Sequence, residues 1–448
     1  MKKFYILLVF LLAGLSAAAV RTVAPVLGID GEESTSVGIY IKEISSGRVI
    51  LEKNGQMALT PASVLKTVTT ASALSLEGAG RRFETKVTLR GHDAGAGTWR
   101  GDIIVRGSAD PTLESENFKG NRGFCDSIVA ALRRKGITTV EGTVVVEQSL
   151  RDAGPILQWE VEDLAWPYGA GLYGFNWRDN VVTVYPNTGR IVPEAPGFSM
   201  EVRPSSSGNN FVRGIDSDRL IVYRRNMDRN WAVKTTVPDP AAVFGAEMGR
   251  KLGAAGIRIG AEPVSSDTDS QTPLYMHYSP VFSEIMRSLM VRSDNLFAEG
   301  ILRSMAPDGS RKSAIEREKS LWASRGIDPE FTIINDGSGL TRANRLSSHF
   351  LGDMLEWMAR SELADTFVGF FPVAGKEGTL RGTLARSPLK GRVALKTGSV
   401  RSVQCYAGYK LDAAGKPTHI IVIMVNGFFC PRAQVRKGVE RLLESVFL

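Results

Sequence analysis

The sequence predicts an α+β fold in which two separated stretches of chain form one antiparallel sheet with helices on its faces. Three observations lead to this prediction. Apolar and polar residues alternate over residues 36–52, around Ser45-Ser46-Gly47, as in a β-hairpin. Residues 392–447 contain three more strand candidates and an amphipathic helix. Between these stretches, residues 85–260 consist of short β-like runs separated by Gly, Pro, Asn and Ser, which predicts a mostly-β inserted region.

Composition and charge exclude several classes of protein. With 448 residues, 43% hydrophobic and 23% charged, and with 46 Gly, 20 Pro and 3 Cys, the chain is neither disordered, collagen-like nor a disulfide scaffold. Its length predicts more than one domain. The formal net charge of +8 arises from Lys and Arg scattered along the sequence, whereas nucleic-acid binding needs basic residues clustered on one face. We therefore expect no nucleic-acid partner.

Residues 1–19 have the pattern of a secretory signal peptide. Two lysines precede an apolar stretch over residues 4–15, and Ala17 and Ala19 have the A-x-A spacing of a cleavage site. The apolar stretch is shorter than the roughly 20 residues that span a bilayer; an uncleaved membrane anchor is the alternative. We expect an exported, soluble mature protein with at most peripheral membrane contact.

A buried helix is predicted after the N-terminal hairpin. Thr60 is the expected N-cap and Pro61 the expected first helical residue. The apolar residues that follow recur at helical spacing, which predicts one face packed into the core: Val64, Leu65, Val68, Ala71 and Leu74.

The remaining elements follow from the same signals. In the inserted region, strands are expected at 87–90, 103–106, 144–147, 181–185 and 219–223. A helix from Asp239-Pro240 toward Ala255 closes this region by residue 260. Further on, helices are expected at 281–305, 314–326, 347–361 and 432–447, and strands at 392–396, 403–411 and 419–426. The sequence thus divides into residues 1–19, 20–84, 85–260 and 261–448.

Three cysteines cannot all pair within one chain, and none has metal-ligand spacing. In the predicted hairpin of the last two strands, Cys405 faces a residue near Ile423, which leaves Cys430 roughly 20 Å further along. A Cys405–Cys430 disulfide requires the chain after Phe428 to fold back, so the sequence leaves this pairing open. Cys125 has no predicted partner.

Ser63 and Lys66 place a hydroxyl and an amine three residues apart, on one helix face. Lys66 can therefore serve as the base for Ser63, whose place in the first turn favours developing negative charge. This role requires the pKa of Lys66 to fall from about 10.4 toward 7, through burial or a second nearby cation. The spacing alone also occurs by chance in structural helices.

A second lysine occurs in Lys396-Thr397-Gly398, at the end of an apolar strand candidate and before Ser399. A cation and a hydroxyl there can bind a substrate carboxylate, while glycine lets a substrate backbone lie against the strand edge. A purely structural strand end is the alternative.

Ser293, Asp294 and Asn295 interrupt an apolar helical segment. The serine can move protons between Lys66 and a leaving group, and the asparagine can hold both a lysine and a substrate carbonyl. A solvated patch inside the helix is the alternative.

In this order, S-x-x-K, S-D-N and K-T-G form the motif set of penicillin-binding proteins and class A β-lactamases. The long interval between Lys66 and Ser293 holds the whole β-rich region and disfavours the compact class A enzymes. The chain resembles the low-molecular-mass class C penicillin-binding proteins, D-alanyl-D-alanine carboxypeptidases and endopeptidases typified by penicillin-binding protein 4. Six segments carry this resemblance: Pro61-Ala62-Ser63-Val64-Leu65-Lys66, Gly107-Ser108-Ala109-Asp110-Pro111-Thr112-Leu113, Ser293-Asp294-Asn295-Leu296, Asp336-Gly337-Ser338-Gly339-Leu340, Gly378-Thr379-Leu380 and Lys396-Thr397-Gly398-Ser399.

The resemblance implies a serine β-lactamase/transpeptidase-like catalytic domain with an insertion between its first two motifs. It implies periplasmic action on peptidoglycan stem peptides through a Ser63 acyl-enzyme, and covalent inhibition by β-lactam antibiotics. The implied oxyanion donors are the backbone N–H groups of Ser63 and Ser399, and Lys396 and Thr397 contact the substrate carboxylate. No cofactor is expected.

Other functions fit the sequence less well. The histidines accompany no G-x-S-x-G elbow, and no H-E-x-x-H or C-x-x-C occurs, so we expect neither a Ser-His-Asp hydrolase nor a metal site. A β-lactamase of unusual length and a non-catalytic cell-wall binding or scaffolding protein on the same fold remain the alternatives. The sequence does not assign the oligomeric state.

Overall fold

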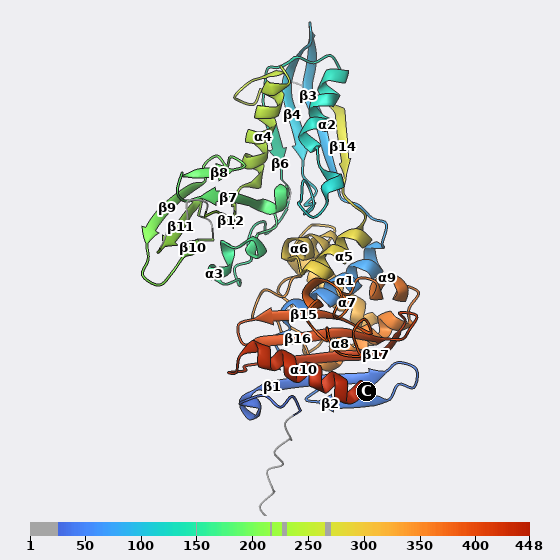
Figure 1. Cartoon of the computed structure of the whole chain (residues 1–448). Helices are drawn as coiled ribbons and strands as arrows, with labels where there is room; N and C mark the ends of the chain where they lie inside the picture. The colour runs from blue at the N-terminus through green and yellow to red at the C-terminus, as the bar shows by residue number, and fades with distance from the viewer. Residues whose placement is uncertain (1–25, 149, 216, 226–230, 265–269) are drawn as a thin grey trace, which may run out of the picture.

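The computed structural model describes residues 26–448 except 149, 216, 226–230 and 265–269, so the predicted signal peptide lies outside the described residues. The predicted α+β architecture is confirmed. A five-stranded sheet with helices on both faces forms one part, and the β-rich inserted region forms the other (Figure 1).

The first sheet joins the two ends of the chain. It contains β1 (Ser36–Glu43), β2 (Val49–Lys53), β15 (Val393–Val400), β16 (Val403–Leu411) and β17 (Pro417–Asn426). Their order is β15-β16-β17-β1-β2, and every neighbouring pair is antiparallel. The N-terminal hairpin therefore lies beside the C-terminal meander, as the sequence predicts.

Both faces of this sheet are buried, because helices cover each side. In β17, Ile420, Val422 and Met424 belong to one apolar cluster, and the alternate residues Ile421, Ile423 and Val425 belong to another. This is the period-two alternation of a strand with two apolar faces. The helix α10 (Arg432–Phe447) covers the second face and is seen in front of the sheet in Figure 1.

The other face carries a group of helices around α1 (Leu65–Glu77). Every residue of α1 from Leu65 to Leu74 is buried, because the helix packs against four others. These are α5 (Phe282–Arg292), α6 (Asn295–Ser304), α7 (Arg311–Ser324) and α8 (Ser348–Arg360), with the short α9 (Ala364–Val368) beyond α8.

Two details at the helix ends differ from the sequence prediction. Thr60 is not an N-cap: its hydroxyl donates to the carbonyl of Arg342 at 3.3 Å, and a 3₁₀ turn, η2 (Ala62–Val64), precedes α1. The helix predicted over 281–305 is two helices, α5 and α6. They are separated because Ser293 is left-handed, with φ 62°, and the Asp294 carboxylate accepts a hydrogen bond from the Phe297 N–H at 3.0 Å.

The inserted region has a core of its own, built on three sheets. The largest has the order β13-β5-β4-β3-β14, with β6 also paired to β4. Its strands are β3 (Glu84–Gly95), β4 (Thr98–Arg106), β5 (Thr139–Val140), β6 (Val144–Glu147), β13 (Arg258–Ile259) and β14 (Gln271–Tyr278). The helices α2 (Phe124–Arg134) and α4 (Pro240–Ala254) pack with it, and Asp239 caps α4 as predicted.

Two small sheets complete the inserted region. One has the order β12-β7-β8 and consists of β12 (Val233–Thr236), β7 (Val181–Tyr185) and β8 (Arg190–Val192). The other has the order β10-β11-β9 and consists of β10 (Asn210–Arg213), β11 (Arg219–Arg224) and β9 (Ser199–Pro204). A short helix, α3 (Val161–Leu164), and a 3₁₀ turn, η4 (Pro167–Gly169), also belong to this region, and η4 contacts α6. The region extends beyond the predicted limit at residue 260, because β14 pairs with β3 as far as Tyr278.

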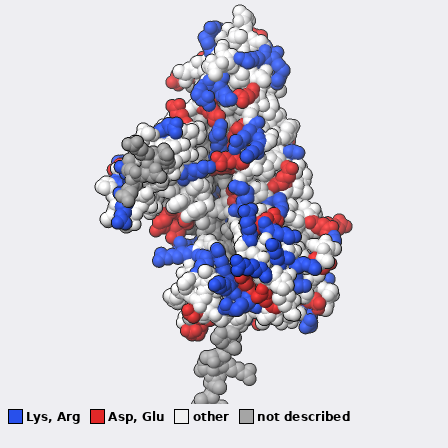
Figure 2. All heavy atoms as spheres, in the orientation of Figure 1, with Lys and Arg blue, Asp and Glu red and all other residues white. Residues whose placement is uncertain are grey.

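All three cysteines are free thiols. Cys405 and Cys430, whose pairing the sequence left open, therefore form no disulfide. Cys405 lies opposite Met424, one residue from the expected register. Figure 2 shows Lys and Arg interspersed with Asp and Glu over the viewed face, and basic side chains beside the hollow between the two parts. None of the described helices is both long and apolar enough to cross a membrane.

The packing of β16 against β15 depends on a glycine. Gly408 has φ 152°, and a Cβ there would lie 2.3 Å from the carbonyl oxygen of Ala394. We expect Gly408→Ala to destabilise the protein by about 3 kcal/mol, measured as a lower thermal unfolding midpoint. Gly253→Ala in α4 is the matched control, because a Cβ there meets nothing within 4 Å; it is expected to be neutral or slightly stabilising. Equal effects of the two substitutions would contradict this account of the packing.

Candidate active site

Ser63 lies in the η2 turn, which is held between β15 and the loop of residues 336–341. Ala62 has a left-handed backbone, with φ 47°. A Cβ on Gly339 would lie 2.0 Å from the Ala62 carbonyl oxygen, and one on Gly398 would lie 2.6 Å from that of Pro61 and 2.9 Å from the Ser63 nitrogen. The glycine of K-T-G is thus required by the close approach of β15 to the Ser63 turn, a different reason from the substrate contact inferred from the sequence.

The Lys66 ammonium donates three hydrogen bonds. Its Nζ lies 3.1 Å from the Oγ of Ser63, 2.6 Å from the Oδ1 of Asn295 and 2.6 Å from the carbonyl oxygen of Ser338. The side chain is fully buried. Burial lowers the pKa of Lys66 from its ordinary 10.5 to about 8, against the carboxylates of Asp336 and Glu299, which raise it.

Lys396 is the second buried amine of the site. Its Nζ donates to the Oγ of Ser293 at 2.8 Å and to the carbonyl oxygen of Thr397 at 2.7 Å. Burial, and then the neighbouring Lys66 cation, hold the pKa of Lys396 well below its ordinary value. Burial, more than a neighbouring cation, is thus the main cause of the lowered pKa of both lysines.

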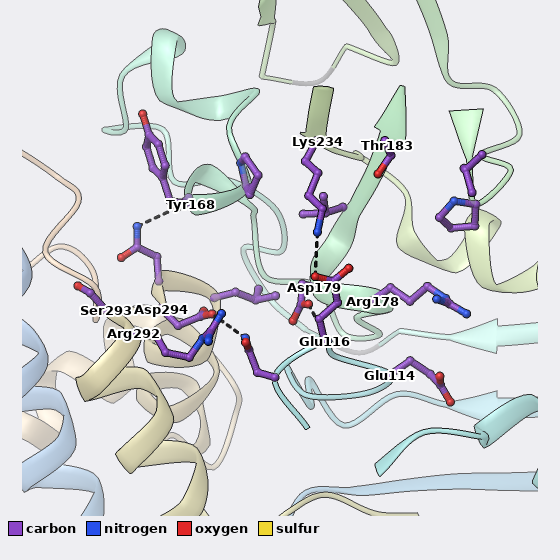
Figure 3. A pocket seen from close by; sticks show the side chains of 17 residues that line it. Glu114, Glu116, Tyr168, Arg178, Asp179, Thr183, Lys234, Arg292, Ser293 and Asp294 are labelled. Atoms are coloured by element: carbon purple, nitrogen blue, oxygen red, sulfur yellow. Dashed lines mark hydrogen bonds and ion pairs between the residues drawn. The ribbon is translucent and has the colours of Figure 1, made fainter. Parts of the chain in front are cut away.

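The break between α5 and α6 brings the S-D-N residues to the two lysines. Ser293 reaches Lys396 from the left-handed position, while Asn295, the first residue of α6, reaches Lys66. The amide of Asn295 also donates to the backbone carbonyl of Tyr168 at 2.8 Å (Figure 3). Because Tyr168 lies in η4, this amide connects the buried amine with the inserted region.

A buried carboxylate that the sequence analysis did not identify positions the loop around Ser338. Glu299 is one helical turn after Asn295 in α6, and its Oε1 accepts hydrogen bonds from the backbone N–H groups of Gly337, at 3.0 Å, and Ser338, at 2.9 Å. Burial raises the pKa of Glu299 to about 7. The sequence does carry one indication of this role, because Glu299 is a charged residue within the apolar run of α6.

Asp336 holds the other side of the same loop. Its carboxylate accepts hydrogen bonds from the backbone N–H groups of Gly339 and Thr341, from the Asn344 amide, and from the indole of Trp159 at 3.0 Å. Trp159 belongs to the inserted region. The D-G-S-G-L segment is therefore a rigid support for the Ser338 carbonyl that binds Lys66.

Two cavities open at Ser63. One, of about 170 Å³, is lined by hydroxyl groups, including that of Thr397, whose Oγ1 is hydrogen-bonded to the Oγ1 of Thr379 at 2.7 Å. Ser399 lies on its wall and donates to Gln404 at 2.9 Å. The other, of about 340 Å³, is lined by residues of both parts of the molecule: Ser63, Asp163, Tyr168, Ser293, Asn295, Gly339, Leu340, Arg342, Ser399, Val400 and Arg401.

All eight residues selected from the sequence thus lie at one site. A serine hydroxyl contacts a buried amine of lowered pKa, and a second amine contacts a second serine, which is an arrangement suited to nucleophilic catalysis with proton transfer. Within the described ranges, no group of three or more His, Cys, Asp or Glu side chains could hold a metal ion.

The model of the family described as "D-Ala-D-Ala carboxypeptidase 3 (S13) family" matches residues 22–444. The D-alanyl-D-alanine carboxypeptidase DacB of Haemophilus influenzae is 26% identical over 432 residues, covering 88% of this chain and 86% of that protein. The crystal structure of penicillin binding protein 4 (dacB) from the same organism has a TM-score of 0.78 at 24% identity, covering 92% of this chain and 96% of that one. Its complex with a β-lactam has a TM-score of 0.74, with the same identity and coverage.

The burial of Lys396 is expected to cost stability. We expect Lys396→Met to stabilise the protein by about 1–2 kcal/mol at pH 6, because it removes a buried amine for which the described residues supply two acceptors. The pKa of this amine is lowered by folding, so the unfolded chain binds more protons and wild-type stability rises as pH approaches 10.5. The gain should therefore shrink toward pH 10.

Thermal unfolding midpoints measured from pH 6 to 10 test this expectation. Lys312→Met is the matched control, because the Lys312 side chain is 86% exposed. A destabilised Lys396→Met variant, or a gain that does not depend on pH, would contradict the expected cost of burying the amine.

Proposed function

The chain belongs to the D-Ala-D-Ala carboxypeptidase 3 (S13) family, and we propose that it is an exported serine peptidase that removes the terminal D-Ala of peptidoglycan stem peptides through a Ser63 acyl-enzyme. The observation that carries this proposal is the 3.1 Å contact between the Lys66 amine and the Ser63 hydroxyl, in a site where the amine is fully buried.

In the first step, Ser63 Oγ attacks the carbonyl carbon of the penultimate D-Ala and neutral Lys66 takes the hydroxyl proton. Asn295 Oδ1 and the Ser338 carbonyl, which already accept hydrogen bonds from this amine, hold it in place. As the new C–O bond forms, the C–N bond to the terminal D-Ala breaks, and a proton moves through Ser293 to the leaving amine. Water then hydrolyses the ester and restores the serine.

The developing oxyanion lies between the turn and the strand. The backbone N–H groups of Ser63 and Ser399 are the donors that we assign to it, and the close approach of Gly398 to the Ser63 nitrogen supports this assignment. In comparable sites, losing one such donor costs about 3–4 kcal/mol of transition-state stabilisation.

The two cavities at Ser63 suit the two ends of a linear substrate. The hydroxyl groups of Thr397 and Thr379 line the smaller one and can bind the terminal carboxylate there, and the buried Lys396 ammonium, which donates to the Thr397 carbonyl, adds positive charge beside them. The larger one, with Tyr168, Leu340 and Arg342 on its walls, can take the rest of the stem peptide. This division requires no contribution from a metal or cofactor.

The same proposal covers where the protein acts, what inhibits it and which bonds it cleaves. The signal-peptide pattern of residues 1–19 supports export to the periplasm. β-Lactam antibiotics, which acylate serine enzymes of this type, are the expected inhibitors. Cleavage of cross-linked peptides is a second expected activity, because it breaks the same kind of D-Ala amide bond.

The nucleophile can be identified by acylation with benzylpenicillin. We expect intact-protein mass spectrometry to show one covalent adduct on the wild type and none on Ser63→Ala, because among the described residues Ser63 supplies the hydroxyl that contacts Lys66. Release of D-Ala from a linear pentapeptide should fall by at least about 10³-fold in the same variant. Ser445→Ala, on α10, is the matched control and should behave as wild type. An adduct that persists without the Ser63 hydroxyl would refute the assignment.

The acid limb of the acylation rate should report the pKa of Lys66. Because the Glu299 carboxylate raises this pKa, we expect Glu299→Gln to move the limb to lower pH, by about one unit or less. Gln retains the Oε1 acceptor for the loop. Penicillin acylation rates from pH 5 to 10 measure the limb, with the exposed Glu316→Gln as control. An unmoved limb, or one moved to higher pH, would show that Glu299 does not act on the amine.

A further inference from the structure

Three cavities meet at Ser293, whereas a linear substrate needs only two. The two that open at Ser63 both include Ser293 on their walls. The third has a volume of about 440 Å³, within the range of ligand sites. It is bordered by Ser293, Asn295 and Tyr168 and extends along the inserted region as far as Thr183 and Lys234 (Figure 3). A branched substrate would occupy all three.

We propose that the third cavity binds the second peptide strand of a cross-linked peptidoglycan substrate, with Arg292 holding a carboxylate of that strand and Asp179 accepting one of its N–H groups. This inference rests on the proposed function and adds to it the place that the leaving strand occupies and the residues that bind it.

The reaction geometry favours the leaving strand as the occupant. When a cross-link is cut, water supplies the new carboxyl group of the first strand, the C–N bond breaks, and the freed amine of the second strand takes the proton delivered through Ser293. The second strand therefore departs from Ser293, which is also the residue where the third cavity begins. A terminal D-Ala is too short to extend from there into the cavity.

The walls of the cavity carry charges of both signs, and most of these are already paired. Lys234 forms an ion pair with Glu116 at 2.8 Å. Arg178 donates to both carboxylate oxygens of Glu247, at 2.8 and 2.9 Å. These pairs hold the β7 and β12 side of the cavity and leave little free charge for a ligand.

Two groups remain for a ligand. Arg292, at the end of α5, is exposed and forms no ion pair or hydrogen bond with any described residue. Asp179 accepts the backbone N–H of Glu116 through Oδ2 at 3.1 Å, and the Ser115 hydroxyl also interacts with this carboxylate, while its buried Oδ1 has no hydrogen bond of normal geometry in the described part of the chain. A guanidinium and an acceptor oxygen in one cavity match a peptide, which offers carboxylates and amide N–H groups. Figure 3 shows both side chains at the cavity.

The test compares two substrates on each variant. We would measure kcat/KM for a cross-linked muropeptide dimer and for a linear pentapeptide, and take the ratio of dimer to linear substrate. We expect this ratio to fall about tenfold in Arg292→Gln and severalfold in Asp179→Asn, because each loses a charged contact that only the dimer makes. Arg134→Gln, an exposed cation on α2, is the matched control and should keep the wild-type ratio.

A second measurement separates binding from chemistry. In the Ser63→Ala background, the affinity for the intact dimer should be weakened by Arg292→Gln, and the affinity for the linear peptide should change much less. Ratios that stay at the wild-type value in both cavity variants, or that fall equally in Arg134→Gln, would overturn the inference. So would a wild-type enzyme that cleaves the linear peptide but not the dimer, a result that leaves the carboxypeptidase proposal standing. Cleavage of neither substrate would instead reject the proposed function itself.

Discussion

The burial of one amine beside one hydroxyl is the constraint on which the site depends. Lys66 lies within the core around α1, where water cannot solvate its charge, so its ammonium donates three hydrogen bonds to Ser63, Asn295 and the Ser338 carbonyl. Each of these partners requires support of its own. Glu299 and Asp336 hold the loop that presents the carbonyl, and the break between α5 and α6 presents the amide. The stability lost by burying a cation is offset by these contacts and by the apolar packing around them.

The inserted region has an apolar core of its own, and it also contributes contacts to this site. Its Tyr168 carbonyl accepts the amide of Asn295, and its Trp159 indole donates to Asp336. Both contacts reach groups that touch Lys66 or the loop beside it. The region also supplies walls of two of the three cavities that meet at Ser293. Movement of the inserted region relative to the five-stranded sheet would therefore act both on the orientation of the amine and on the space for substrate.

One physical reason explains why the motifs contain small residues, namely the lack of space beside the Ser63 turn. Gly398 and Gly339 approach the Ser63 turn so closely that a Cβ on either would overlap its backbone. Ala62 in that turn has a left-handed backbone, which costs of order 1–3 kcal/mol and persists only when its surroundings enforce it. The turn is therefore clamped from two sides, and the clamp places the Ser63 hydroxyl against Lys66. This rigidity suits the nucleophilic role proposed for Ser63, because a nucleophile must keep its geometry when a substrate binds.

The sequence by itself predicted the fold class and most elements, and it selected eight residues that the structure brings together, because apolar periodicity and three short motifs are local signals. It could not place the break at Ser293, since one left-handed residue leaves the apolar pattern of α5 and α6 intact. Nor could it assign Glu299, whose role exists only because α6 lies beside the loop at Ser338. The sequence predicted that the inserted region ends at residue 260. It did not indicate the pairing of β14 with β3, because this pairing joins residues far apart in the chain. The meeting of three cavities at Ser293 was likewise decided by tertiary structure alone, since a cavity is formed by walls from distant segments and has no signal in any one of them.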